Sequence, residues 1–136
     1  MATFRFTHRV SYSECTVGNH VYYSRYLDLL ESARGEFFRH LGKTLLQYQQ
    51  EDVIFPVIEV AVRYLAPARY DDVLSIEVAP VTVHGVRLSF AYRIFTSSEK
   101  VILEGRTHHV CAGYNEKPKR LPKELCARLE PWVVAA

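Results

Sequence analysis

Two hydrophobic periods follow one another in the first third of the chain. From Phe4 to Tyr12, apolar or aromatic side chains alternate with polar ones, a period of two that predicts a half-buried strand. After a polar segment at 13–19, apolar positions recur every three or four residues: Tyr22, Tyr26, Leu29, Leu30, Ala33, Phe37, Phe38 and Leu41. This spacing predicts one face of a long helix, and Gly42 then suits its left-handed C-cap.

Strand patterns occupy most of the remaining sequence. After a short predicted helix at 44–50, the pattern predicts strands at 57–65, 73–83, 87–96 and 101–112. Hairpin-like connections predict that these four strands are antiparallel neighbours. A polar loop at 113–122 precedes a short helix or extended tail at 125–132. One helix cannot cover both faces of such a sheet, so we expect an α+β fold in which the sheet curls around the helix or another subunit covers its second face.

Length, composition and charge narrow the class of protein. The 136 residues predict a single domain over 1–136, and 49% hydrophobic with 24% charged residues argues against disorder. A net charge of +2 does not favour nucleic-acid binding. No apolar run reaches the roughly 18–20 residues of a membrane span, and the first residues lack the order of a signal peptide. Three cysteines without metal-ligand spacing favour a reduced, cytoplasmic compartment and no bound metal.

Four motifs, in this order along the chain, resemble those of hotdog-fold thioesterases. They are the segment entering the helix at 9–26, the Glu-x-Ala-Arg and closing Leu-Gly of the helix at 27–42, the proline-alanine-tyrosine-aspartate turn at 64–72, and the last strand with its tail at 105–122. The closest branch is the 4-hydroxybenzoyl-CoA thioesterase group with its Tol-Pal-associated acyl-CoA relatives. The resemblance covers nearly the whole chain.

This resemblance implies a hotdog fold, in which a curved five-stranded antiparallel sheet wraps one long helix. A cystatin-like cone also places a helix before its strands, but the motifs favour the hotdog fold. The implied activity is hydrolysis of acyl thioesters, carried by coenzyme A or by acyl carrier protein, to a free acid and a thiol. Coenzyme A enters as part of the substrate, and no cofactor is expected. The implied assembly is a homodimer or a dimer of dimers, with acyl clefts at the subunit interface.

Thioester hydrolysis needs a base or nucleophile, a donor for the oxyanion and a cleft for the substrate. Free N–H groups at a helix N-terminus supply the donor. In the family that the chain resembles, a loop aspartate lies seven positions before the N–H that polarises the thioester. The resemblance places this N–H at Tyr23 and the aspartate position at Thr16. A threonine hydroxyl cannot replace a carboxylate as the base.

Two carboxylates close to this position in sequence could supply the missing charge. Glu31 lies eight residues after Tyr23, about two helical turns, and other hotdog branches carry their catalytic glutamate on this helix. It could instead form a structural ion pair with Arg34 or Arg25. Glu14 lies two residues before Thr16 and could face the site or the solvent.

The predicted site therefore contains six residues. The catalytic candidates are Thr16, Tyr23 and Glu31, and the substrate-binding candidates are Asn19, His20 and Tyr22. A further resemblance, to the enediyne-type polyketide thioesterases, involves Gly18-Asn19 and Tyr22-Tyr23. Those proteins lack the aspartate and use polar and basic groups, which here implies Thr16, Asn19, His20 and Arg34.

Other reactive side chains have simpler interpretations. Tyr26, Phe37 and Phe38 are predicted to lie in the core, and His108 and His109 to form a partly exposed pair on the last strand. Cys111 is expected to be buried, and Cys15 has no histidine motif that would lower its pKa. Scattered arginines on the strands could bind coenzyme A phosphates or simply face solvent. Because Thr16 replaces the aspartate, an acyl-thioester-binding protein with little or no hydrolase activity stays the alternative.

Overall fold

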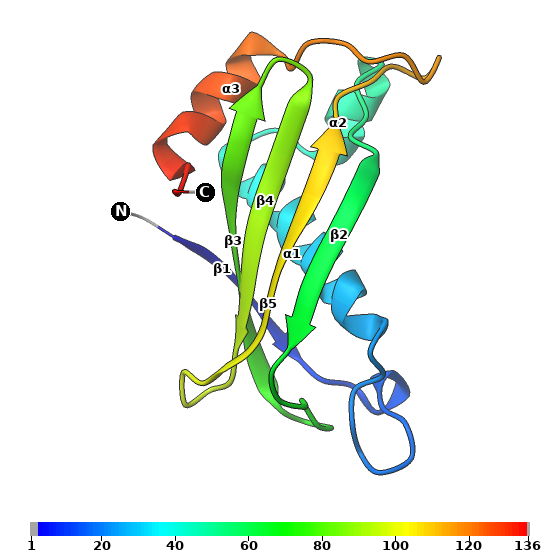
Figure 1. Cartoon of the computed structure of the whole chain (residues 1–136), viewed down its shortest axis with the longest axis vertical. Helices are drawn as coiled ribbons and strands as arrows, with labels where there is room; N and C mark the ends of the chain where they lie inside the picture. Colours follow the sequence, from blue (N-terminus) through cyan, green and yellow to red (C-terminus); the bar gives the residue numbers. More distant parts are fainter. Residues whose placement is uncertain (1–2, 136) are drawn as a thin grey trace.

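A single antiparallel sheet and one long helix form the body of the protein (Figure 1). The computed structural model describes residues 3–135. Its strands are β1 (Phe4–Arg9), β2 (Val57–Tyr64), β3 (Val73–His84), β4 (Arg87–Phe95) and β5 (Val101–Val110). The helices are α1 (Arg25–Leu41), α2 (Leu45–Gln50) and α3 (Lys123–Leu129), with single 3-10 turns at Tyr12–Glu14 and Glu130–Trp132. This arrangement is the hotdog fold expected from the sequence.

The strand order is β1-β3-β4-β5-β2, so the two edges of the sheet are β1 and β2. The predicted antiparallel pairings of β3 with β4 and of β4 with β5 are confirmed. The expectation that β2 is a neighbour of β3 is wrong, because β2 pairs with β5. Residues 65–72, which include Pro67, form a crossing loop rather than a tight hairpin turn, and this loop lets β3 begin at the opposite edge.

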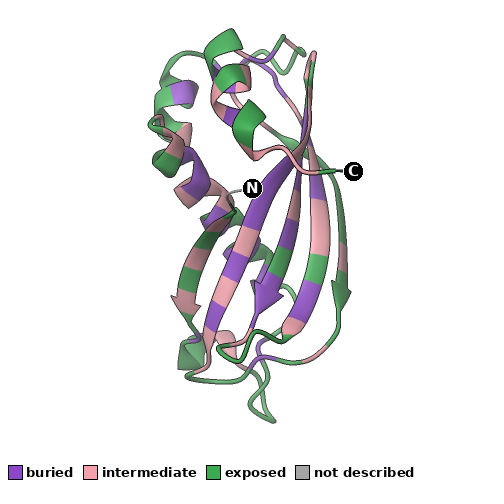
Figure 2. Ribbon diagram, turned by 90° about the vertical axis from the view of Figure 1, so that its left-hand side faces the viewer, coloured by how far each residue is buried: buried purple, intermediate pink, exposed green. Residues whose placement is uncertain are grey.

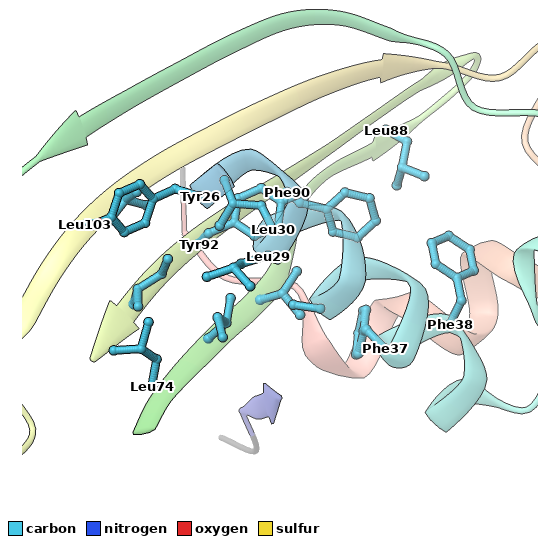
Figure 3. Packing of buried hydrophobic residues seen from close by; sticks show 14 of the residues in the cluster. Tyr26, Leu29, Leu30, Phe37, Phe38, Leu74, Leu88, Phe90, Tyr92 and Leu103 are labelled. Atoms are coloured by element: carbon cyan, nitrogen blue, oxygen red, sulfur yellow. The ribbon is translucent and has the colours of Figure 1, made fainter. Parts of the chain in front are cut away.

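Helix α1 packs its predicted apolar face against the concave face of the sheet (Figures 1 and 3). The buried residues of α1 are Tyr26, Leu29, Leu30, Ala33, Phe37 and Phe38. Figure 3 shows the aromatic and leucine side chains of this set packed against Leu74, Leu88, Phe90, Tyr92 and Leu103 from the strands. The predicted core placement of Tyr26, Phe37 and Phe38 is therefore confirmed. Full burial of one such side chain stabilises the fold by about 1.5–3 kcal/mol.

The C-terminal end of α1 agrees with the sequence prediction, whereas its N-terminal end lies later in the chain. Gly42 has a φ of 101° and ends α1 in the left-handed conformation predicted for it. The helix begins at Arg25, three residues after the first apolar position of the predicted pattern. Strand β1 likewise ends at Arg9 rather than Tyr12, which lies in a 3-10 turn. Residues 10–24 therefore form a loop that leads into the N-terminus of α1.

The edge strand β2 is exposed along most of its length (Figure 2). Val60 pairs in register with the inward-facing Thr107, yet its side chain is 43% exposed because α1 does not cover this edge. Tyr64, at the end of β2, is 44% exposed. An apolar, unpaired edge of this length is a surface on which another strand can pair. Among the described residues, no helix is long and apolar enough to cross a membrane.

Candidate active site

The loop before α1 is held by its own backbone hydrogen bonds. The Thr16 N–H donates to the His20 carbonyl at 2.8 Å, and the Tyr22 N–H donates to the Glu14 carbonyl at 2.9 Å. Asn19 has a φ of 61°, a left-handed conformation that asparagine tolerates better than most residues. These bonds place Tyr22 and Tyr23 at the beginning of the helix.

Glu14 is committed to the structure of this loop. Its carboxylate accepts hydrogen bonds from the Ser11 N–H at 2.7 Å and from His8 Nε2 at 2.8 Å. Partial burial raises the pKa of Glu14, but the bonds from Ser11 and His8 outweigh this effect and leave the pKa below its ordinary value. A carboxylate stabilised in its charged form by two donors is a poor proton acceptor. The structure therefore favours the loop-forming role of Glu14.

Three of the predicted site residues lie on the same loop. The Thr16 hydroxyl is exposed and lies 3.3 Å from the His20 carbonyl oxygen. The Asn19 side-chain oxygen accepts a hydrogen bond of 3.1 Å from the Tyr70 N–H, which ties this loop to residues 65–72. His20 lines a hollow of about 370 Å³ beside the start of α1. Of Thr16, Asn19 and His20, His20 is the one that lines this hollow, where a ligand could contact it.

Tyr23 lies at the entrance of this hollow, with its side chain 62% exposed. Within the described residues its N–H forms no hydrogen bond, whereas its carbonyl accepts one of 2.9 Å from the Tyr64 hydroxyl. The Tyr22 and Tyr23 rings are in contact, with centroids 4.7 Å apart and planes tilted by 45°. A free N–H one residue before Ser24, the N-cap of α1, and beside an open hollow is a suitable donor for a thioester carbonyl.

Glu31 lies about two turns further along the chain from Tyr23 and lines a different cavity, of about 170 Å³. Its side chain is exposed, and within the described part of the chain it forms no ion pair. The two arginines considered as its partners are engaged elsewhere: Arg25 lies 3.5 Å from Asp28, and Arg34 donates to Tyr92. Glu31 thus has the freedom that a general base needs.

A single chain does not bring Tyr23 and Glu31 to one reacting carbon. They are eight residues apart, which corresponds to about 12 Å along a helix axis. They also line separate hollows. A base must lie within hydrogen-bonding reach of the proton that it removes. The two candidates can therefore cooperate only if they come from two subunits.

A buried polar chain borders the cavity at Glu31. Arg34 donates to the Tyr92 hydroxyl at 2.8 Å, the Tyr92 and Thr107 hydroxyls lie 2.6 Å apart, and Thr107 lies 2.8 Å from His109 Nε2. His109 Nδ1 lies 3.0 Å from the Phe55 carbonyl oxygen. Burial, followed by the nearby Arg34 charge, lowers the pKa of His109 to about 4 despite the opposing hydrogen bond to Phe55.

The expectation of a partly exposed histidine pair on β5 is wrong for His109, which is 2% exposed. His109 shares the inward face with Leu103 and Thr107, and the period of two along β5 could have revealed this. His108 points to the outer face and lies 2.7 Å from the Ser89 hydroxyl.

The cysteines lack the surroundings of a nucleophile. Cys111 is fully buried as expected, and burial raises the pKa of its thiol. The Cys15 sulfur lies 3.8 Å from the Ser11 carbonyl, and no histidine within the described residues bonds to it. A raised or unassisted thiol is a weak nucleophile at neutral pH.

A larger hollow, of about 640 Å³, lies on the face of the sheet away from α1. Its floor consists of small residues such as Ala79 and Ala91, and its charged side chains include the Glu77–Arg93 ion pair of 2.8 Å. Glu104 also lines it and forms no ion pair among the described residues, but no helix N-terminus of the described chain lies in its lining to supply an oxyanion donor. The chemistry therefore favours the smaller hollows along α1.

Known proteins resemble this chain over most of its length. The family model of the Thioesterase-like superfamily matches residues 10–129. Acyl-CoA thioester hydrolase YbgC of Escherichia coli is 34% identical over 128 residues, which cover 93% of this chain and 96% of that protein. Acyl-CoA thioesterase YbgC of Haemophilus influenzae is 35% identical over 129 residues, covering 91% and 92%.

A solved structure extends the similarity to the whole fold. The probable thioesterase from Bartonella henselae superimposes with a TM-score of 0.84 at 25% identity, covering 89% of this chain and all of that one. The match in sequence includes the loop before α1, the helix and the last strand. The chain therefore belongs to the Thioesterase-like superfamily of hotdog-fold acyl-CoA thioesterases and hydrolyses acyl thioesters.

Proposed function

We propose that this chain hydrolyses acyl-CoA thioesters in two equivalent sites of a homodimer, each formed by the start of α1 in one subunit and the Glu31 cavity of the other. The observation that carries the proposal is the free N–H of Tyr23 beside an open hollow at a helix N-terminus. The alternative of a binding protein without hydrolase activity is less favoured, because the relatives named above are thioester hydrolases.

The proposed chemistry uses the backbone of Tyr23 and the carboxylate of Glu31. The Tyr23 N–H donates to the thioester carbonyl oxygen and stabilises the negative charge that develops there. Glu31 removes a proton from water as the water oxygen bonds to the carbonyl carbon. The carbon–sulfur bond then breaks, and the leaving thiolate takes up a proton. Net hydrolysis yields a carboxylic acid and coenzyme A, with no metal or redox cofactor in any step.

The edge strand β2 supports the dimer. Phe55 precedes β2 and lines the Glu31 cavity, whereas Tyr64 ends β2 and contacts Tyr23. Antiparallel pairing of two β2 strands about a two-fold axis places the end of one beside the beginning of the other. Tyr23 of one subunit then lies next to the Glu31 cavity of its partner. This pairing would also cover the exposed apolar side chains of β2.

The remaining predicted residues have supporting roles in this proposal. His20 lines the hollow through which the pantetheine arm would arrive, and the exposed Tyr22 contacts Tyr23 beside it. Asn19 fixes the loop through Tyr70. The exposed hydroxyl of Thr16, on the loop that carries the aspartate in related enzymes, donates to the His20 carbonyl and can still accept a hydrogen bond from water. We propose a cytoplasmic protein that acts on coenzyme A thioesters rather than on acyl carrier protein, since the named relatives act on acyl-CoA.

A thiol-release assay tests this function. A panel of short, long and aromatic acyl-CoAs, with the matching acyl carrier protein thioesters, is incubated with the protein, and free thiol is measured. We expect release from at least one acyl-CoA and a lower kcat/KM for the same acyl group on carrier protein. Light scattering at micromolar concentration should give a dimer or a dimer of dimers. A monomer, or higher kcat/KM with carrier protein, would contradict the proposal.

A further inference from the structure

The cavity beside Glu31 has both apolar and polar lining residues. Its apolar lining comes from three elements and includes Phe38, Leu45, Leu88 and Phe90. Its polar lining consists of Glu31, Arg34, Gln49 and His109. A cavity of about 150 Å³ lined by apolar side chains accepts a benzene-sized molecule, so a volume of about 170 Å³ has room for an acyl group of about six carbons.

The hydrogen-bonded chain from Arg34 to the Phe55 carbonyl has one possible donor–acceptor direction. The Phe55 carbonyl can only accept, so His109 Nδ1 carries the proton and the neutral ring leaves Nε2 as an acceptor. The Thr107 hydroxyl therefore donates to Nε2 and accepts from the Tyr92 hydroxyl. Because the Tyr92 hydroxyl already donates its single proton to Thr107, its oxygen accepts a hydrogen bond from the Arg34 guanidinium. The chain runs from Arg34 to Phe55 with no spare donor inside it.

This direction leaves Arg34 as the one member with unused donors. A guanidinium has five N–H groups, and among the described residues Arg34 bonds only to Tyr92. Arg34 forms no ion pair within the described part of the chain, although the residue is half-buried. Arg34 is also one of the residues that line the cavity. A ligand atom that accepts a hydrogen bond would satisfy the remaining N–H groups of Arg34.

We propose that Arg34 determines acyl-group specificity by donating to a hydrogen-bond acceptor at the distal end of the acyl group, and that Tyr92, Thr107 and His109 are positioning residues that act through it. The substrate class is a coenzyme A thioester of a short acyl group that carries a carbonyl or hydroxyl oxygen near its end. This inference rests on the proposed function, since it assigns the cavity to the acyl group.

Binding of two non-hydrolysable ligands tests the proposal separately from catalysis. The ligands are S-hexyl-CoA, a thioether, and its derivative with a ketone on the penultimate carbon. Calorimetry on the wild-type protein should show about tenfold tighter binding of the ketone, the scale of a hydrogen bond to a charged donor. Arg34→Met should reduce this preference to within about twofold. Equal binding of both ligands by the wild-type protein would overturn the proposal.

Variants along the chain separate positioning from folding. Thr107→Val keeps the volume but removes the hydroxyl, and Tyr92→Phe removes the acceptor of Arg34; both should lose most of the ketone preference. Thr107→Ser keeps the hydroxyl and should retain the preference. Ser89→Ala is the matched control, because it removes another buried strand hydroxyl bonded to a histidine, on the outer face. It should lower the melting temperature without changing the ratio of the two dissociation constants.

The outcomes also distinguish this inference from the proposed function. Thiol release from simple acyl-CoAs with no ketone preference in binding would overturn the role of Arg34 and leave the hydrolase standing. If Thr107→Val and Ser89→Ala change the preference equally, the positioning role is wrong. If neither thioether binds, the cavity is not an acyl site, and this inference fails whatever the thiol-release assay shows.

Discussion

The Tyr64 hydroxyl donates a hydrogen bond of 2.9 Å to the carbonyl oxygen of Tyr23. This bond joins the end of the edge strand β2 to the residue whose N–H is free at the start of α1. This hydrogen bond therefore links the position of Tyr23, the proposed oxyanion donor, to the β2 edge on which a second subunit could pair. We expect the bond to matter more for catalysis than for stability, because Tyr64 is 44% exposed.

Removal of this bond tests that expectation. Tyr64→Phe should lower kcat about threefold to tenfold, which corresponds to a single hydrogen bond of about 1 kcal/mol, with a small change in melting temperature. Tyr114→Phe is the control, since Tyr114 is 58% exposed and its hydroxyl bonds to no described residue. An equal loss of kcat in both variants would contradict the role of Tyr64.

The function of Tyr23 is assigned to its backbone. Tyr23→Phe should therefore keep most of the wild-type kcat. Tyr23→Pro removes the N–H and should lower kcat by about 10²–10³, the usual effect of losing one oxyanion donor. Steady-state kinetics and circular dichroism on both variants are the measurements. A large loss in Tyr23→Phe would assign the role to the phenol instead.

Glu31 is the proposed general base, and its removal should affect turnover rather than folding. Glu31→Gln should lower kcat roughly a hundredfold or more, with the melting temperature nearly unchanged because Glu31 is exposed and forms no ion pair among the described residues. Glu36→Gln on the same helix, where Glu36 lies 3.6 Å from Arg39, is the matched control. Its kcat should stay at the wild-type value.

Thr16→Asp gives an independent check on the base. It restores the carboxylate that related thioesterases carry on this loop. If Thr16→Asp raises kcat strongly while Glu31→Gln has no effect, Glu31 is not the base. The chain would then be a thioester-binding relative that has lost its catalytic carboxylate.

The buried His109 predicts a pH dependence of stability. Burial and the Arg34 charge lower its pKa from 6.5 to about 4, so between these values the unfolded chain binds a proton that the folded chain does not. Stability is therefore fully present above pH 6.5 and falls as the pH falls toward 4, by at most about 3 kcal/mol. The charged or titratable groups that influence His109 are Arg34 and His108.

Urea unfolding at about pH 7 and about pH 4.5 measures this effect. The wild-type protein should lose more stability between the two values than His109→Gln, whose side chain does not titrate. His108→Gln, on the opposite face of β5, should behave as the wild type does. The same pH dependence in the wild type and His109→Gln would show that another group controls it.

Local patterns predicted the elements well. The period of α1 correctly selected Leu29, Leu30 and Phe37 for the core, and alternation placed Leu88, Phe90 and Tyr92 on one face of β4. These features depend on neighbouring residues in the chain, which the sequence displays directly.

Long-range contacts could not be predicted in the same way. The pairing of β2 with β5 depends on where the loop at 65–72 crosses, and the bond between Asn19 and Tyr70 joins residues 51 positions apart. Likewise, the sequence favoured Glu31 over Glu14 but left the partners of both open; the structure shows Glu14 bonded to His8 and Glu31 without an ion pair among the described residues. The buried hydrogen bonds that end at His109 join three strand residues and one helix residue. A local hydrophobic period cannot predict contacts between residues so far apart in sequence.

The central claim, a catalytic site shared between two subunits, is tested most directly by mixing two inactive variants. Tyr23→Pro and Glu31→Gln are each purified, co-refolded at equal concentrations, and assayed for acyl-CoA hydrolysis. In a mixed dimer, one of the two sites combines the intact Tyr23 of one subunit with the intact Glu31 of the other. The account predicts recovery of about a quarter of the wild-type kcat for random mixing. Activity that stays at the level of the separate variants would show that each site is built within one subunit, and would contradict the account.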